Sequence, residues 1–372
     1  MPNLQTSLAT RIHPPSELTN NKWSAEDFDS RRIFSIPEVV VALLIYCIIP
    51  QKKEKIITEI STFYKLSPQK INLLILSLIE KKLIFLKDES QISADKNKLN
   101  SELFLEQYPI WKKYNWESAA EYHFFTYDYP FLNYAEGAEG WRIANQRMNE
   151  YSAKYPDTNR IKVYSEEHKR LNVPLPFNDH SLGAKQFHAE ENNLKLISII
   201  TAYGFAKTAE APIRWEGVPL IRRTSPSGGS RHPTEGYLIA LDIEGIDKGL
   251  YHIQSDPFCF VKIKEQEKID TPAIFPEFFP NELNNQPMAI IVLTSVFERN
   301  MFRYREPRTF RTIHMDAGHI LGTMELISDS IGMKSQISHQ IDEKLIEQLI
   351  GIDGLSEGVI TSMAIFNASG GN

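Results

Sequence analysis

Cysteine is scarce in this chain of 372 residues, which contains only Cys47 and Cys259. Two cysteines are too few for a disulfide framework or for a cysteine-rich zinc site. The chain also opens without the charged and then apolar segment of a secretion signal. We therefore expect a soluble protein of a reducing compartment, located in the cytoplasm.

Positive charge and long apolar runs are missing as well. The formal net charge is −6 at pH 7 and the pI is near 6.0, whereas general nucleic-acid binding needs a basic face. The longest apolar run, residues 39–50, is shorter than the roughly 20 residues of a membrane-spanning helix. We expect neither a nucleic-acid partner nor a membrane partner.

Apolar and aromatic residues are plentiful, at 42% and 11% of the chain, which is ample for a packed core. The length suits two domains. The composition shifts predict a polar, flexible arm, a small helical domain, an aromatic-rich connecting region and a larger second domain. Their expected ranges are 1–30, 31–100, 101–170 and 171–372.

The small domain over 31–100 has the outline of a winged helix. Apolar spacing predicts three helices between residues 35 and 80 and a strand at 83–88, with Pro37 and the pair Ser67-Pro68 marking helix starts. Such a domain binds DNA, docks a peptide or is purely structural. The expected recognition helix carries Lys70 as its single basic residue, which disfavours DNA.

The connecting region is rich in Trp and Tyr between residues 104 and 131. Helices that pack aromatic side chains across a domain interface explain this composition, and a lid over a substrate is the functional alternative. From about residue 181 onward, helix and strand patterns alternate. They predict an α+β domain in which helices cover a mostly antiparallel sheet.

Two stretches of the second domain carry candidate chemistry. In the first, the small residues 225–229 stand between Arg223 and Arg231 and precede a buried strand. Bare backbone lets N–H groups approach a planar or anionic ligand, and arginines suit phosphate or carboxylate. A simple turn would have the same composition.

The second stretch, residues 297–319, places five arginines around Tyr304 just before a long helix. This density suits an anion-binding rim at a helix N-terminus, and an ion-pair network is the equal alternative. His314, Asp316 and His319 do not have the spacing of a metal site, so we expect no metal.

Together these stretches resemble the SagB-type dehydrogenases of the FMN-dependent nitroreductase superfamily, the flavoproteins of ribosomal-peptide maturation. The likeness covers roughly residues 170–368 in the family's order. It rests on SPSGGSRHPTEGY at 225–237, GLYHI at 249–253, Arg299, Arg303-Tyr304, Arg308, Phe310-Arg311, DAGH at 316–319 and IGIDGLSEG at 350–358.

The resemblance implies a nitroreductase-like, sheet-and-helix flavin domain that binds FMN in a homodimer. It implies oxidation of azoline rings, thiazoline or oxazoline, to azoles in a precursor peptide. A winged-helix-like domain at the N-terminus would grip the leader of that peptide. Azoline substrates in turn imply a cyclodehydratase partner.

The resemblance also assigns site residues. The family's Lys-Tyr pair, which serves proton transfer, falls on Arg303 and Tyr304, the implied catalytic residues. The implied cofactor-binding residues are Lys185, Arg223, Ser225, Pro226, Ser227, Gly228, Glu235 and Arg308.

The chain departs from the family at two points. Arg303 replaces a lysine, and arginine keeps its proton. Either Tyr304 acts alone as the base, with flanking arginines expected to lower its pKa, or the reaction differs. Segment 181–187 retains only Lys185 of the family's flavin-phosphate signature. These departures keep two alternatives open: an FMN-dependent NAD(P)H reductase, and a non-catalytic peptide-binding member that has lost flavin.

Overall fold

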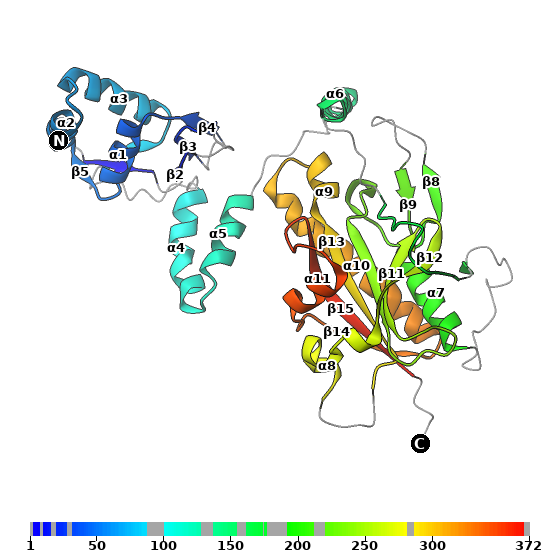
Figure 1. Cartoon of the computed structure of the whole chain (residues 1–372). Helices are drawn as coiled ribbons and strands as arrows, with labels where there is room; N and C mark the ends of the chain where they lie inside the picture. The colour runs from blue at the N-terminus through cyan, green and yellow to red at the C-terminus, as the bar shows by residue number, and fades with distance from the viewer. Residues whose placement is uncertain are drawn as a thin grey trace. The chain divides into compact units, whose positions relative to one another are not determined.

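The computed structural model describes residues 3–7, 10–15, 20–27, 32–87, 100–127, 137–154, 161–173, 175–176, 192–211, 220–280 and 286–367. The chain forms two compact units, Met1–Tyr129 and Pro130–Asn372 (Figure 1). None of the helices among the described residues has the length and apolar character needed to cross a bilayer.

The first unit is built on three helices that start where the sequence predicts. They are α1 (Glu38–Tyr46), α2 (Lys53–Tyr64) and α3 (Pro68–Glu80). The Ser67 hydroxyl accepts a hydrogen bond from the Lys70 N–H at 3.3 Å, and Pro68 occupies the first turn of α3, where its missing N–H costs nothing. The helices enclose a core with buried Leu43, Ile56 and Ile71 at its centre.

The segment expected to be a flexible arm instead contributes strands to this unit. Strand β1 (Asn3–Thr6) lies between β5 (Gln51–Lys52) and β6 (Ile84–Lys87) and is antiparallel to both. Leu4 explains the difference, because its side chain is fully buried in the helical core. A second antiparallel sheet joins β2 (Thr10–His13), β3 (Ser24–Asp27) and β4 (Arg32–Ser35).

The aromatic-rich region expected to connect the domains is divided between the units. Helices α4 (Asn100–Lys113) and α5 (Glu117–Thr126) belong to the first unit and α6 (Ala138–Lys154) to the second. Trp111 stacks on His123 across the α4–α5 pair, with 5.8 Å between ring centroids.

The second unit is organised around a seven-stranded antiparallel sheet, as the α+β prediction required. Its order is β14 (Lys334–Ser338), β15 (Glu357–Phe366), β13 (Ala289–Val296), β10 (Thr234–Ala240), β11 (Gly249–Ser255), β12 (Phe258–Glu265) and β7 (Arg170–Asn172). Every residue of β10 and β13 is buried, which explains the apolar runs 237–240 and 289–293 within them.

Helices cover both faces of this sheet (Figure 1). Helices α7 (Asn193–Phe205) and α10 (Phe310–Ser330) pack on the face that carries Leu238, while α8 (Thr271–Ile274) and α11 (Glu343–Ile350) pack on the face that carries Tyr237. Side chains alternate along a strand, so the two neighbours face opposite layers. A short hairpin, β8 (Ala209–Ala211) and β9 (Leu220–Arg222), and the short helix α9 (Phe297–Arg303) complete the unit.

Candidate functional site

The small-residue loop at 225–229 lies against one face of α10. The Ser225 hydroxyl is 2.9 Å from the Thr323 hydroxyl, and the Ser227 hydroxyl donates to Asp316 Oδ2 at 2.7 Å. The Gly228 N–H donates to Asp316 Oδ1 at 3.2 Å. Two loop donors that the sequence suggested for a ligand are therefore taken by one buried carboxylate of the same chain.

The two glycines of this loop allow side chains from other parts of the chain to approach the loop backbone closely. A Cβ on Gly228 would come within 2.6 Å of the Thr312 methyl carbon. Gly229 has a φ of +61°, and a Cβ there would come within 2.6 Å of the Tyr304 hydroxyl oxygen. The bare backbone is thus required both by the left-handed conformation and by the close approach of Thr312 and Tyr304.

The expected catalytic pair lies at the end of α9, directly beside this loop. Arg303 Nη1 donates to the Gly229 carbonyl at 3.4 Å, and the Arg303 guanidinium carbon is 5.5 Å from the Tyr304 ring centroid. Both side chains are partly exposed. The fold therefore brings together two stretches that are 74 residues apart in the sequence.

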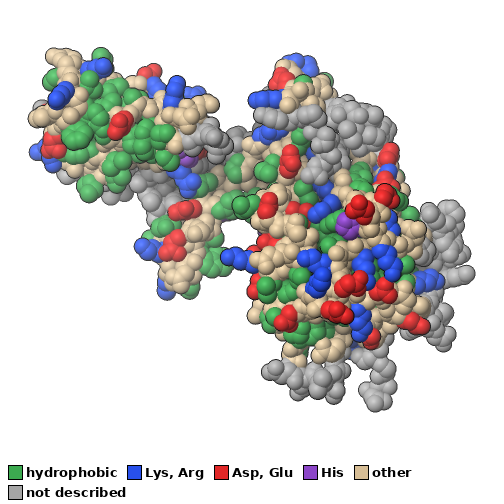
Figure 2. Space-filling model, in the orientation of Figure 1, with side chains coloured by type: hydrophobic (Ala, Val, Ile, Leu, Met, Phe, Trp, Pro, Cys, Tyr) green, Lys and Arg blue, Asp and Glu red, His purple; other side chains and the backbone are tan. Residues whose placement is uncertain are grey.

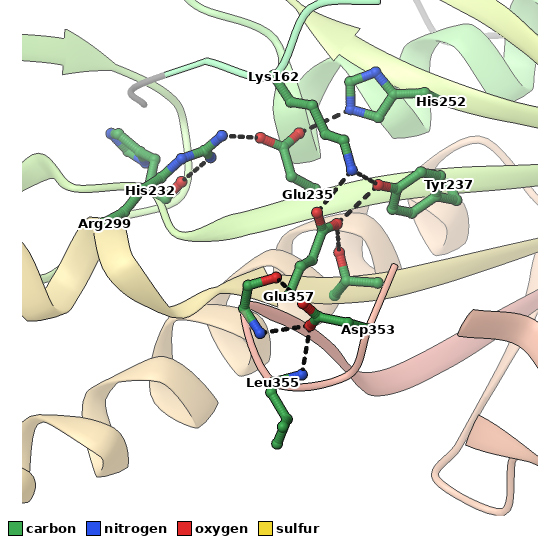
Figure 3. A network of polar contacts seen from close by, with 11 residues as sticks. Lys162, His232, Glu235, Tyr237, His252, Arg299, Asp353, Leu355 and Glu357 are labelled. Carbon is green, nitrogen blue, oxygen red and sulfur yellow. Dashed lines mark hydrogen bonds and ion pairs between the residues drawn. The ribbon is translucent and has the colours of Figure 1, made fainter. Parts of the chain in front are cut away.

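Glu235, expected to bind the cofactor, is instead the centre of a buried ion cluster (Figure 3). Its carboxylate is 2.5 Å from Arg299 Nη2 and accepts from His252 Nε2 at 2.9 Å. Burial raises the pKa of Glu235, but Arg299, His252 and Arg223 outweigh it, so the pKa lies far below its ordinary value. Because both carboxylate oxygens are engaged inside the protein, we reassign Glu235 to holding the sheet and α9 together.

A second cluster, which the sequence did not reveal, lies next to the first (Figure 3). Lys162 Nζ donates to the Tyr237 hydroxyl at 2.6 Å and to Glu357 at 2.7 Å. Tyr237 in turn donates to Glu357 at 2.8 Å, and burial strongly raises the pKa of Tyr237. Lys162 and Glu357 are 195 residues apart, so no local pattern could have paired them.

The turn before β15 places Glu357 in this cluster. Asp353 accepts from the N–H groups of Leu355 and Ser356 at 2.7 and 2.6 Å (Figure 3). The bonds with Ser356 and Leu355 lower the pKa of Asp353 to about 2, so it is ionised at neutral pH. This turn belongs to the IGIDGLSEG segment, whose role here is to position a strand.

The remaining candidate residues differ in accessibility. Arg223 is buried and donates from Nη1 to the Thr234 carbonyl at 3.2 Å, while its Nε has no hydrogen-bond partner among the described residues. Burial lowers the pKa of Arg223 to about 10, so it stays charged at neutral pH. Arg308 is partly exposed and lies in the short 3₁₀ helix Pro307–Thr309 that precedes α10. Pro226 is exposed, and Lys185 lies outside the described residues.

The donors around the loop suit an anionic, planar group. A buried guanidinium with an unpaired Nε is a fit for phosphate or carboxylate oxygen. The exposed Arg222 precedes the loop in the chain, and the partly exposed Arg308 precedes α10, the helix on which the loop lies. In the part of the chain that the structure describes, no three His, Cys, Asp or Glu side chains gather as metal ligands.

Comparison with known proteins finds a family match over most of the second unit. Residues 196–366 match the Nitroreductase family. The trifolitoxin-processing protein TfxB of Rhizobium leguminosarum bv. trifolii is 24% identical over 265 residues, which are 66% of this chain and 69% of that protein.

Solved structures similar to this chain include three from bacteria. One from Anabaena variabilis has a TM-score of 0.42 and 20% identity, and the match covers 60% of this chain but only 46% of that one. A chain of the Escherichia coli microcin synthetase McbBCD complex with truncated pro-MccB17 bound has a TM-score of 0.38, 16% identity and coverage of 73% and 98%. A Desulfovibrio desulfuricans structure in complex with FMN has a TM-score of 0.27, 13% identity and coverage of 48% and 88%.

Proposed function

Because residues 196–366 of this chain are a nitroreductase family domain, we propose that the protein is an FMN-dependent oxidoreductase of peptide maturation that oxidises azoline rings to azoles. The observation that carries the proposal is the contact between the Ser225–Gly229 loop and the Arg303-Tyr304 pair. The similarity to a trifolitoxin-processing protein supports a peptide as the substrate.

The proposed cofactor-binding set consists of four residues of the loop and three basic residues. Ser225, Pro226, Ser227 and Gly228 would hold FMN by the loop, and Arg223, Arg308 and Lys185 would supply positive charge for its phosphate. The buried Arg223, with its unpaired Nε, is the residue present whose chemistry fits that phosphate best. Bound FMN would accept a hydride as the azoline ring loses two hydrogens.

Tyr304 is the proposed proton acceptor. Oxidation of an azoline also releases a proton, and a phenolate at Tyr304 would take it on its hydroxyl oxygen. Arg303 cannot act as a base, but its cation 5.5 Å from the Tyr304 ring would favour the phenolate. Arg303 also holds the Gly229 carbonyl, so one side chain would link the base to the cofactor loop.

The first unit is proposed to bind the leader of the precursor peptide, as a winged-helix-like domain. Strand β6 pairs with β1 alone among the described strands, and the proposed peptide would add a strand at the other edge of β6. Helix α3 contacts β6 and exposes Leu73 and Leu76, at 65% and 48%. Figure 2 shows hydrophobic side chains gathered over the part of the first unit that holds its helices. A strand edge beside exposed leucines suits an extended, partly apolar peptide.

A homodimer is proposed through the outer face of α10. Met315 and Leu326 on this face are 59% and 72% exposed. Between them, a Cβ on Gly318 or Gly322 would have no atom within 4 Å, so a second helix could approach closely. A cyclodehydratase that supplies the azoline is the further partner that the chemistry requires.

One observation favours a second candidate function, a non-catalytic peptide-binding protein without flavin. Asp316 occupies the Ser227 and Gly228 donors, and Thr312 and Tyr304 fill the space above the glycines. In that protein the arginines would form a peptide-binding surface.

Mass spectrometry of an azoline-containing precursor peptide separates the two. The proposed enzyme, supplied with FMN and oxygen, removes two hydrogens from each ring it oxidises. Binding of the peptide with no mass change under these conditions identifies the non-catalytic protein.

A further inference from the structure

Helix α10 presents a single polar stripe to the loop. The contacts come from Thr312, Asp316, His319 and Thr323, which are spaced by four, three and four residues and so lie on one helix face. Only Asp316 in this stripe is charged and buried. The loop is therefore seated on the helix mainly through one carboxylate.

The Asp316 carboxylate is also the last acceptor in a short series of hydrogen bonds that links His232 to Ser227 within the loop. The His232 N–H donates to Ser227 Oγ at 2.9 Å, and the Ser227 hydroxyl donates onward to Asp316 at 2.7 Å. With the Gly228 N–H as its second donor, Asp316 fixes the loop at two consecutive residues. His232 has a φ of +47°, which is a strained conformation. The same series of hydrogen bonds therefore also holds the strained turn that leads into β10.

We infer that Asp316 is a positioning residue for cofactor binding, whose carboxylate holds the Ser225–Gly229 loop in the shape that receives FMN. The chemistry requires a carboxylate, because an amide has one acceptor oxygen and a carboxylate has two. Asparagine at this position can accept from the Gly228 N–H, but it then turns its amide N–H groups toward Ser227, so the Ser227 hydroxyl loses its acceptor and can only accept a bond there. This inference rests on the proposed function only for the identity of the cofactor.

A role in stability alone would have a different signature. Burial raises the pKa of Asp316, so keeping the side chain ionised in the fold costs free energy. A neutral asparagine of the same size removes that cost. Because asparagine removes that cost, a positioning residue would lose FMN affinity with the melting temperature preserved. A residue kept only for its hydrogen bonds within the fold would instead lower the melting temperature when replaced and leave FMN affinity unchanged.

The test compares Asp316→Asn and Asp316→Ala with Asp242→Asn, the same chemical change at an exposed site of the second unit. Hydrogen–deuterium exchange of the apoprotein reports the Gly228 and His232 amides, and fluorescence titration with FMN reports affinity. We expect exchange in the 225–232 peptide to accelerate and the FMN dissociation constant to rise about tenfold in Asp316→Asn, and more in Asp316→Ala. Asp242→Asn should match the wild type in both.

Unchanged loop exchange and unchanged FMN affinity in Asp316→Asn would overturn the inference. So would a fall in melting temperature with affinity preserved. Failure of the wild type to bind FMN would remove the proposed function, and the exchange measurement on the apoprotein would still decide whether Asp316 holds the loop.

If both Asp316 variants fail to fold, Ser227→Ala takes their place, because it removes one bond to Asp316 and leaves the carboxylate intact. Accelerated exchange at His232 and Gly228 with a weaker FMN complex would support the inference. Exchange and affinity like those of the wild type would reject it.

Discussion

Both units of this protein expose apolar side chains, Leu326 and Leu355 in the second among them, but the buried ion cluster around Glu235 belongs to the second unit. The first unit exposes apolar side chains, with Phe63 at 79% and Leu73 at 65%. The second buries charged ones, with Arg299 at 1% and Glu235 at 2%. Exposed apolar side chains serve binding to a partner, whereas buried charges persist only where each has a partner inside the fold.

Under the proposed function, the first unit serves recognition of the peptide and the second serves the chemistry. Changes on the surface of the first unit should alter what it binds and leave its stability intact. Changes within the buried clusters of the second unit should cost stability first. Each of the following experiments tests one side of that contrast.

The largest effect is expected from breaking the Glu235–Arg299 pair. Glu235→Gln leaves a buried guanidinium without its anion and should lower the free energy of unfolding by about 3–5 kcal/mol. Urea denaturation followed by hydrogen–deuterium exchange would assign the loss to the second unit. The control is Glu166→Gln, which breaks the exposed Glu166–Arg170 pair and should cost less than about 1 kcal/mol. Equal costs for the two variants would contradict the contrast.

The next effect concerns chemistry alone. Tyr304→Phe should retain FMN and lower kcat by about a hundredfold or more, because it removes the proposed proton acceptor. Tyr114→Phe, an exposed tyrosine of the first unit, is the control and should keep full turnover. Turnover of the Tyr304 variant at the wild-type rate would remove Tyr304 from the mechanism.

Acid sensitivity is expected from His232, which the second unit buries uncharged. Burial first, and then Arg223, lower the pKa of His232 to about 3, whereas an unfolded histidine titrates near 6.5. The unfolded state therefore binds the proton first, and stability falls as the pH drops below about 6.5, by about 2 kcal/mol at pH 5.

His232→Asn should remove this acid dependence, since asparagine tolerates the positive φ of the site and does not titrate. Thermal melting between pH 8 and pH 5 measures it. His314→Asn, at an exposed position, is the control and should keep the wild-type slope. A slope that is the same in all three proteins would exclude His232 as its source.

The smallest effect on stability, and a clear one on binding, is expected in the first unit. Leu73→Glu with Leu76→Glu should weaken leader-peptide binding by about tenfold or more and change the free energy of unfolding by no more than about 0.5 kcal/mol. Fluorescence anisotropy with a labelled peptide measures the affinity. Leu355→Glu, at a still more exposed leucine of the second unit, should bind the peptide as the wild type does.

Local signals predicted what depends on local structure. Pro37, Ser67 and Pro68 marked the helix starts of the first unit, and the apolar runs at β10 and β13 marked central strands. The family resemblance assigned the loop and Tyr304 to one site, and in the structure Arg303 and Tyr304 lie against Gly229 of that loop.

The features that escaped prediction depend on distant contacts. Strand β1 has the sequence NLQT, with one apolar residue, and becomes a strand only because β5 and β6 flank it. Lys162 gives no local hint of Glu357. The resemblance includes Asp316 in the DAGH motif, but nothing in its helix indicates that the Ser227 hydroxyl and the Gly228 N–H donate to it.

The central claim is that the loop, Arg223 and the Arg303-Tyr304 pair form a flavin site. The most direct test is the visible absorption spectrum of the purified protein, with mass spectrometry of whatever acid releases from it. We predict a flavin spectrum and close to one FMN per chain. A colourless protein that also fails to bind added FMN would contradict the claim and identify the arginine-lined site as a peptide-binding surface.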